Sequence, residues 1–114
     1  MGDGLKKIWI LFIILCVILV SGCVRQDEIS LEEQAKSTCI DLCEKYKDLV
    51  DYTNGPCISD NSLDWEVEDW VCDVAHSPRQ NVDNLPENQC IAFRNGEAHH
   101  FVEVDPDCNF IKAV

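Results

Sequence analysis

The sequence predicts a small α+β domain: an N-terminal amphipathic helix packs on a short antiparallel sheet of two or three strands, disulfides hold the two together, and a hydrophobic leader helix precedes them. Three observations predict this class. Apolar residues recur with a helical period between residues 31 and 49. Apolar and polar residues alternate between residues 97 and 104, as in a strand with one buried face. Six cysteines follow the leader, an even number that is typical of small disulfide-bonded domains.

The first helix of the domain is predicted to begin after Ser30 and to end near Tyr52. Ser30 with Glu33 three residues later is the capping-box pattern, in which side chains satisfy free backbone amides at a helix start. Asn54-Gly55-Pro56 follows the helix, because glycine adopts the left-handed conformation of a helix end and proline blocks continuation. The apolar stripe consists of Leu31, Ala35, Cys39, Leu42, Tyr46 and Leu49.

Two strands are predicted in the second half of the chain, at residues 70–75 and 99–104. The first is rich in aromatic and β-branched residues, which favour strands. In the second, the even-numbered residues are mostly apolar, and this face is expected to pack on the helix. Glu97, His99 and Glu103 are then expected to face outward.

The segment between these strands, residues 85–94, has two interpretations. It can be a short helix that Asn84 and Glu87 cap and that Asn95-Gly96 ends. Alternatively, Asn95-Gly96 is the type I′ turn of a hairpin whose two strands flank it. Both interpretations are compatible with a single α+β domain.

The six cysteines after the leader are expected to form three structural disulfides. About 92 residues remain once the leader is removed, and a core of that size is marginal without covalent support. Cys39 and Cys43 are not expected to pair with each other, because residues one helical turn apart have Cβ atoms about 5 to 6 Å apart and a disulfide needs about 3.8 Å. The other pairings stay open. The six residues are Cys39, Cys43, Cys57, Cys72, Cys90 and Cys108.

The first 23 residues have the pattern of an export signal. Lys6-Lys7 precedes the apolar run Ile8–Val20, and the small residues Ser21-Gly22 follow it. The same run can be an uncleaved anchor, because Ile8–Val24, at 17 residues, has the shortest length with which a helix crosses a bilayer. Either interpretation places the domain on the extracytoplasmic face of the cell membrane.

Val20-Ser21-Gly22-Cys23 resembles the lipobox of prokaryotic lipoproteins, in which a bulky aliphatic residue and two small residues precede a cysteine. In that family the cysteine receives a diacylglyceryl group and becomes the first residue of the mature protein. The resemblance implies lipidation of Cys23. It implies a signal peptide or anchor at residues 1–22, a lipidated cysteine with a short tether at 23–29, and a single cysteine-rich extracytoplasmic domain at 30–114.

From Val24 onward the chain is strongly acidic, with 7 Lys and Arg against 20 Asp and Glu and a net charge of −13. Nucleic-acid binding requires a basic footprint, and anionic lipid headgroups attract basic rather than acidic segments. The charge therefore excludes nucleic acid as a partner. It leaves a membrane contact through the N-terminal lipid or anchor, and a basic protein as a partner of the domain.

No catalytic residue, metal ligand or cofactor is predicted. The chain has no GxSxG, no HExxH and no phosphate-binding glycine loop, and its cysteines lack the CxxC spacing of redox and zinc sites. Imidazoles are ligands for zinc and copper, so His76, His99 and His100 are the candidate ligands if the protein binds a metal. Neighbouring residues of a strand point to opposite faces, so at most one of His99 and His100 is expected to join a common site.

The loop His76-Ser77-Pro78-Arg79-Gln80 is the best candidate for a binding surface. It has no evident role in the core, and loops carry function more often than cores do. We expect His76 and Arg79 to contribute to binding and to be dispensable for stability. The sequence thus predicts a membrane-tethered, extracytoplasmic, non-catalytic binding or envelope protein. The alternatives are an acidic inhibitor or immunity-type protein that captures a basic exported enzyme, and a metal-binding lipoprotein.

Overall fold

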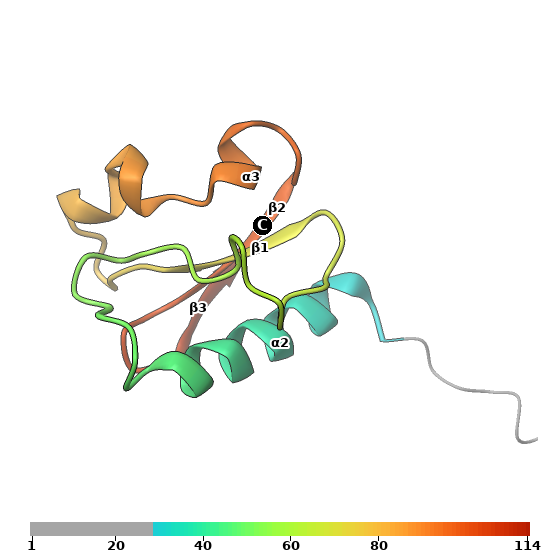
Figure 1. Cartoon of the computed structure of the whole chain (residues 1–114), viewed down its shortest axis with the longest axis horizontal. Helices are drawn as coiled ribbons and strands as arrows, with labels where there is room; N and C mark the ends of the chain where they lie inside the picture. The colour runs from blue at the N-terminus through green and yellow to red at the C-terminus, as the bar shows by residue number, and fades with distance from the viewer. Residues whose placement is uncertain (1–28) are drawn as a thin grey trace, which may run out of the picture.

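The computed structural model describes residues 29–114, in which one long helix packs on a three-stranded sheet. The long helix α2 (Leu31–Tyr46) covers one face of the sheet, and the short helix α3 (Ile91–Arg94) lies over the other (Figure 1). The predicted α+β class is therefore confirmed. The predicted leader helix, the lipobox with Cys23 and most of the tether lie outside the described residues. Within residues 29–114, no helix combines the length and the apolar character needed to cross a bilayer.

Helix α2 begins as predicted and ends earlier. Ser30 is its N-cap, and the Ser30 side chain accepts a hydrogen bond from Glu33 N at 3.2 Å. The helix stops at Tyr46, so the predicted end near Tyr52 is wrong. Tyr52 is nevertheless buried, and its hydroxyl donates to Cys43 O at 2.9 Å. This hydrogen bond ties the segment after the helix back to the last turn of α2.

The sheet has the strand order β1-β2-β3 and is mixed rather than antiparallel. β1 and β2 run parallel, with Trp70 opposite His100, whereas β2 and β3 run antiparallel. The predicted antiparallel arrangement is thus wrong for the first pair. The chain between β1 and β2 crosses over one face of the sheet and returns to its starting end, which gives parallel neighbours. The strands are β1 (Trp70–Val74), β2 (His100–Val104) and β3 (Phe110–Ala113).

The crossover contains the second predicted helix in a much shorter form. Two 3-10 turns, η1 (Asn81–Asn84) and η2 (Pro86–Asn88), precede α3, and Gln89 between η2 and α3 is extended. Residues 85–94 are therefore not one continuous helix. Asn95 is the C-cap of α3, and Gly96 follows it with a φ of +76°, in the left-handed region. Asn95-Gly96 ends a helix, so the helical interpretation of this turn is confirmed and the hairpin interpretation is wrong.

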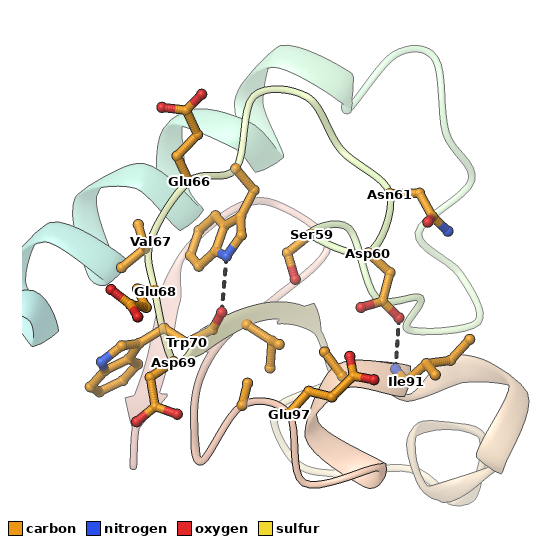
Figure 2. Close-up of a pocket in the computed structure, with 14 residues that line it drawn as sticks. Ser59, Asp60, Asn61, Glu66, Val67, Glu68, Asp69, Trp70, Ile91 and Glu97 are labelled. Carbon is orange, nitrogen blue, oxygen red and sulfur yellow. Dashed lines mark hydrogen bonds between the residues drawn. The ribbon is translucent and has the colours of Figure 1, made fainter.

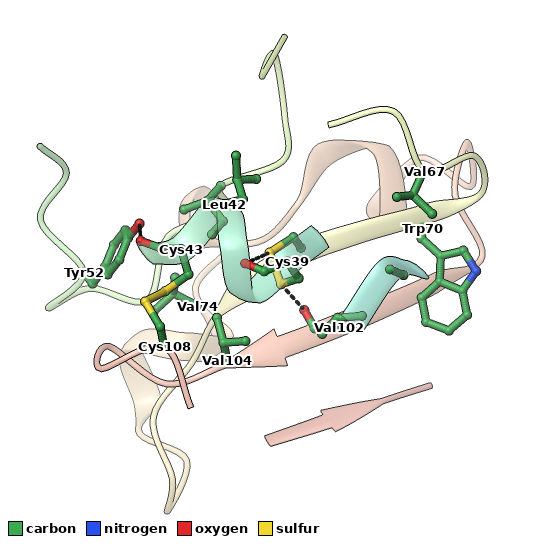
Figure 3. Close-up of a cluster of buried hydrophobic side chains, with 13 residues drawn as sticks. Cys39, Leu42, Cys43, Tyr52, Val67, Trp70, Val74, Val102, Val104 and Cys108 are labelled. Atoms are coloured by element: carbon green, nitrogen blue, oxygen red, sulfur yellow. Dashed lines mark hydrogen bonds between the residues drawn. A yellow bond between two sulfur atoms is a disulfide. The ribbon is translucent and has the colours of Figure 1, made fainter. Parts of the chain in front are cut away.

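The main core lies between α2 and the sheet (Figure 3). Val102 and Val104 of β2 face α2, so the predicted packing of this apolar face on the helix is confirmed. Two disulfides join the helix to other segments across this core. Cys39 is bonded to Cys72 in β1, and Cys43 is bonded to Cys108 just before β3. The two helical cysteines do not pair with each other, as predicted.

The second face of the sheet has a smaller apolar cluster, which the crossover covers. Val71 and Ala98 pack there around the third disulfide, Cys57–Cys90. Asp73 and Glu103 lie opposite each other on β1 and β2 on this face, with exposed fractions of 8% and 5%. The prediction that Glu103 faces solvent is wrong. β2 has the predicted alternation, but the crossover excludes water from the face that carries Asp73 and Glu103.

Candidate functional site

An open groove of about 520 Å³ lies between the loop that precedes β1 and helix α3 (Figure 2). No Lys, Arg or His side chain is among the described residues that line it. We call it the acidic groove. Its lining includes five carboxylates, Asp60, Glu66, Glu68, Asp69 and Glu97.

Hydrogen bonds to the backbone hold the walls of the acidic groove in place. The Trp65 indole Nε1 donates to Trp70 O at 2.9 Å, and the Asp60 carboxylate accepts from Ile91 N at 2.6 Å (Figure 2). The first bond ties the loop to β1, and the second ties it to the start of α3. Because indole N–H and carboxylate groups are fixed by these bonds, the groove is largely formed before any ligand binds.

Glu66, Glu68 and Glu97 are exposed and form no ion pair or side-chain hydrogen bond with any other residue of the described range 29–114. They differ in this from the other two carboxylates of the acidic groove, which have partners. Exposed carboxylates attract cationic groups over roughly a Debye length, about 8 Å at physiological salt. These three side chains therefore give the groove its capacity for cations.

Asp69, at one end of the acidic groove, contacts two of the three histidines considered as metal ligands. Nδ1 of His99 is 2.6 Å from Asp69 Oδ1, and Nε2 of His100 is 3.6 Å from Asp69 Oδ2. The hydrogen bond from His99 lowers the pKa of Asp69. Both histidines thus contact one carboxylate, His99 from the residue before β2 and His100 from its first residue, but with Asp69 they do not form a group close enough to share a metal ion within residues 29–114. His76 bonds elsewhere, to Asp83.

Within the part of the chain that the structure describes, one group of side chains is close enough to share a metal ion, and it consists of Cys57, Asp60 and Cys90. The two cysteines form a disulfide. Cysteine binds metals as the thiolate, which a disulfide sulfur is not. In the oxidised protein this group therefore offers a metal only the carboxylate of Asp60.

The two predicted binding residues, His76 and Arg79, bond to buried carboxylates. Nδ1 of His76 lies 2.8 Å from Oδ1 of Asp83, which is 1% exposed. Arg79 Nη1 donates to Glu103 Oε1 at 2.7 Å. The expectation that their loop has no role in the core is therefore wrong. A role of the two residues in binding stays a prediction.

The buried carboxylate of Asp83 holds this loop in place through hydrogen bonds to its backbone. Its Oδ2 accepts from the backbone amides of His76 at 3.0 Å and Gln80 at 2.9 Å. Burial raises the pKa of Asp83, but these two amides and the His76 ring outweigh burial, so the pKa lies below its ordinary value. Gly55 approaches the same carboxylate so closely that a Cβ there would be 2.4 Å from Oδ1. Any larger residue at position 55 would displace Asp83.

A second, smaller pocket of about 110 Å³ opens on this face beside Arg79, and we call it the Asp73 pocket. Oδ1 of Asp73 is buried and has no hydrogen-bond partner among the described residues. Burial, and after it the charge of Glu103, raises the pKa of Asp73 to about 8. The lining residues are Val71, Asp73, Arg79, Gln89, Cys90, Phe93, Phe101 and Glu103.

No protein-family model, curated protein or solved structure matches this chain. Its function is therefore inferred from the geometry of the acidic groove and the Asp73 pocket. The acidic groove is wide, open and negative, whereas the Asp73 pocket is small and combines aromatic walls with a buried carboxyl group. Sequence reasoning missed Asp73, although one signal was present: it is the single charged residue in the otherwise apolar segment 70–75. Charged residues are rarely buried without a partner, so Asp73 in a strand predicted to be buried indicates an unusual environment for its side chain.

Proposed function

We propose that this chain is a membrane-tethered, extracytoplasmic, non-catalytic binding protein whose acidic groove captures a basic protein. One observation carries the proposal: among the residues that the structure describes, five carboxylates and no basic side chain line a single open groove. Like charges gathered in one cleft focus the electric field, which concentrates and steers ligands of opposite charge. The charge of the mature chain, −13, acts in the same direction.

The composition of the acidic groove favours a protein partner over an isolated cation. Trp65 lines it, and Ile91 at its edge is 58% exposed. Protein interfaces combine an aromatic and aliphatic centre with a polar rim, and a groove of this size accommodates several side chains. An inhibitor or immunity-type protein for a basic exported enzyme would use the same surface and is the more specific form of this proposal.

The tether rests on two separate features. The leader has the charge pattern and the lipobox of an exported lipoprotein, with Cys23 as the residue that would carry the lipid. The three disulfides of the domain support an extracytoplasmic location, because disulfides persist in oxidising compartments and are rare in the cytosol. A lipid on Cys23 would leave only a few residues between the membrane and α2.

Capture is tested by calorimetric titration of the oxidised full-length chain in non-ionic detergent with a decalysine peptide. We expect saturable binding at 50 mM NaCl that weakens by about tenfold or more at 300 mM NaCl, because the charges are screened. A groove variant should bind about tenfold more weakly than the unaltered chain, since it lacks the three unpaired carboxylates. This variant combines Glu66→Gln, Glu68→Gln and Glu97→Gln.

A matched variant controls for the loss of net charge. It neutralises three carboxylates that lie exposed on and just after α2, away from the groove lining, and that form no ion pair with another residue of 29–114. We expect its affinity for decalysine to fall by no more than about threefold. Equal losses of affinity in the two variants would show that binding depends on the net charge of the protein and not on the groove, and would overturn the proposal. The control combines Asp41→Asn, Glu44→Gln and Asp48→Asn.

The tether is tested by the intact mass of the protein extracted from membranes without reductant. We expect a chain that begins at a lipidated Cys23 and lacks about six hydrogens relative to the reduced sequence. A chain that keeps Met1 and lacks six hydrogens would replace the lipid by an uncleaved anchor. A chain that keeps Met1 and six free thiols after residue 24 would overturn the extracytoplasmic location.

A further inference from the structure

We propose that the Asp73 pocket is a binding site for a small primary alkylammonium ion. This proposal is independent of the capture of a basic protein, because none of the five carboxylates of the acidic groove lines the Asp73 pocket. It rests on three features of the pocket: a buried acceptor without a partner, the distribution of charge around it, and the aromatic walls.

The first feature is the acceptor. Asp73 is 8% exposed and lines the pocket, and its Oδ1 has no hydrogen-bond partner within residues 29–114. Buried polar atoms in proteins are nearly always hydrogen-bonded, because leaving one unsatisfied costs about 1 to 3 kcal/mol. A ligand that donates a hydrogen bond into the pocket would satisfy this atom. The protein thus offers an acceptor to whatever occupies the pocket.

The second feature is that Asp73 has no cationic partner among the described residues. Arg79 is the only cation of residues 29–114 that lines the pocket, and its guanidinium is held by other groups. Nη1 donates to Glu103 at 2.7 Å, Nε donates to Asn84 Oδ1 at 2.7 Å, and Nη2 donates to Asp83 O at 3.3 Å. Arg79 therefore neutralises Glu103 and is not free to turn toward Asp73. Lys112 of β3 is also directed at Glu103, at 4.0 Å, and neither cation forms an ion pair with Asp73. An ionised Asp73 therefore has no cationic partner of its own within residues 29–114, and a monovalent cation in the pocket would supply one.

The third feature is the shape of the pocket. Its volume of about 110 Å³ is enough for a few heavy atoms, and the rings of Phe93 and Phe101 meet edge to face in its wall with centroids 5.1 Å apart. Aromatic rings bind ammonium groups through their faces and bury short alkyl chains. Calcium and magnesium need six or more oxygen ligands, which a pocket with two carboxyl groups does not supply. A primary ammonium on a short alkyl chain fits both the charge and the walls.

Binding of a cation to Asp73 is coupled to release of a proton. Four charged groups face Asp73 from the elements packed around it: Glu103 on β2, Arg79 in the loop after β1, Asp83 in η1 and Asp60 in the loop before β1. Burial, with the charge of Glu103, raises the pKa of Asp73 to about 8. The ammonium ion binds the ionised form, so affinity rises with pH until the carboxyl group is fully ionised. For a pKa of about 8, the apparent affinity rises about fifty-fold between pH 6 and pH 8.

The test is an NMR titration of the oxidised, isotope-labelled full-length chain in non-ionic detergent with propylammonium chloride at pH 8. We expect saturable shifts of the amides around the pocket, with Val71, Gln89 and Phe93 among them. Propan-1-ol has the same shape and no charge, and should bind about tenfold more weakly or not at all. The apparent affinity for propylammonium should fall steeply toward pH 6, while an alkylamine stays charged throughout this range.

Asp73→Asn keeps the size of the side chain and removes its charge, so it should abolish the propylammonium shifts. Because Asp73 makes no side-chain hydrogen bond to the rest of 29–114, this variant should stay folded, which its amide spectrum checks. Asp107→Asn removes an exposed carboxylate elsewhere and should bind as the unaltered chain does. The proposal is overturned by the absence of saturable shifts at pH 8, by equal binding of propan-1-ol, or by unchanged binding in Asp73→Asn.

The same variant separates the two proposals. Asp73→Asn should capture decalysine as well as the unaltered chain does, and the groove variant should retain the propylammonium shifts. If the groove variant loses decalysine and Asp73→Asn loses propylammonium, both sites stand. A loss of propylammonium binding in the groove variant would show that the amine occupies the acidic groove instead, and would overturn the assignment to the Asp73 pocket.

Discussion

Arg79 and Glu103 form an ion pair across the second face of the sheet, with Nη1 2.7 Å from Oε1. The Glu103 side chain is 6% exposed and that of Arg79 is 38% exposed, so a partly solvated cation neutralises a buried anion. Lys112 of β3 lies at the other carboxylate oxygen, at 4.0 Å. The pair joins the loop after β1 to β2. It explains why a charged residue is tolerated in the centre of a small sheet.

Arg79→Ala should lower the free energy of unfolding by about 2 kcal/mol at pH 7, because it leaves the Glu103 carboxylate buried without its main partner. Urea unfolding measures the change. Arg94→Ala is the control, since Arg94 is exposed and makes only a 3.5 Å contact with Pro86 O, and it should change stability by less than about 0.5 kcal/mol. Equal effects of the two substitutions would show that the ion pair does not stabilise the fold.

Asp83→Asn should lower stability at pH 7 by about 2 kcal/mol, because an amide cannot accept from two backbone amides and the His76 ring as a carboxylate does. The pKa of Asp83 is lower in the folded state than its ordinary value of 3.8. Its contribution is therefore present above pH 4 and is lost as the pH falls through the folded pKa. Urea unfolding at pH 7 and pH 3 should show the difference between the two proteins shrinking at pH 3. A constant difference would contradict this account.

The effect of Asp73 on the pH dependence of stability is opposite to that of Asp83. The pKa of Asp73, about 8 in the folded protein, is above the ordinary value of 3.8, so the folded state binds a proton that the unfolded state releases. The free energy of unfolding therefore falls as the pH rises from about 4 to 8. Asp73→Asn removes this dependence. Relative to the unaltered chain, it should gain about 3 to 4 kcal/mol between pH 5 and pH 8.

Urea unfolding at pH 5, 6.5 and 8 measures this gain for Asp73→Asn. Asp107→Asn, which changes the net charge equally at an exposed position, should follow the unaltered chain at all three values. If Asp73→Asn also runs parallel to the unaltered chain, Asp73 is ionised in the folded protein over this range, and the steep pH dependence expected for amine binding would not occur.

The three disulfides should contribute unequally to stability. Cys43–Cys108 spans 65 residues, whereas Cys39–Cys72 and Cys57–Cys90 each span 33. Loop-closure entropy predicts a loss of about 4 kcal/mol for each bridge and about 0.6 kcal/mol more for the longest loop.

Urea titration measures the free energy of unfolding of two double variants. One is Cys43→Ala/Cys108→Ala, and the other is Cys57→Ala/Cys90→Ala. The first pair of substitutions should cost more. A larger loss from removal of Cys57–Cys90 would show that this bridge acts through the folded state, by holding the crossover on the second face of the sheet, rather than through the unfolded chain.

Several features could be predicted because they depend on residues close together in the sequence. The start of α2 follows from Ser30 and Glu33, and the end of α3 follows from Asn95-Gly96. The end of α2 could not be predicted in this way, because Tyr52 is held against the last turn of the helix by a contact between residues nine positions apart and not by continuing the helix. The structural role of the loop with His76 and Arg79 could not be predicted for the same reason, since its partner Glu103 is 24 positions from Arg79.

The sequence by itself determined the α+β class, the start of the long helix and the inward face of β2. The tertiary structure alone decided which cysteines pair, that β1 and β2 run parallel, and that Asp73 and Glu103 lie buried side by side. The reason is physical. Helix caps and strand alternation are set by local backbone geometry, whereas pairing, strand direction and the pKa of a carboxyl group depend on which distant segments exclude water from it.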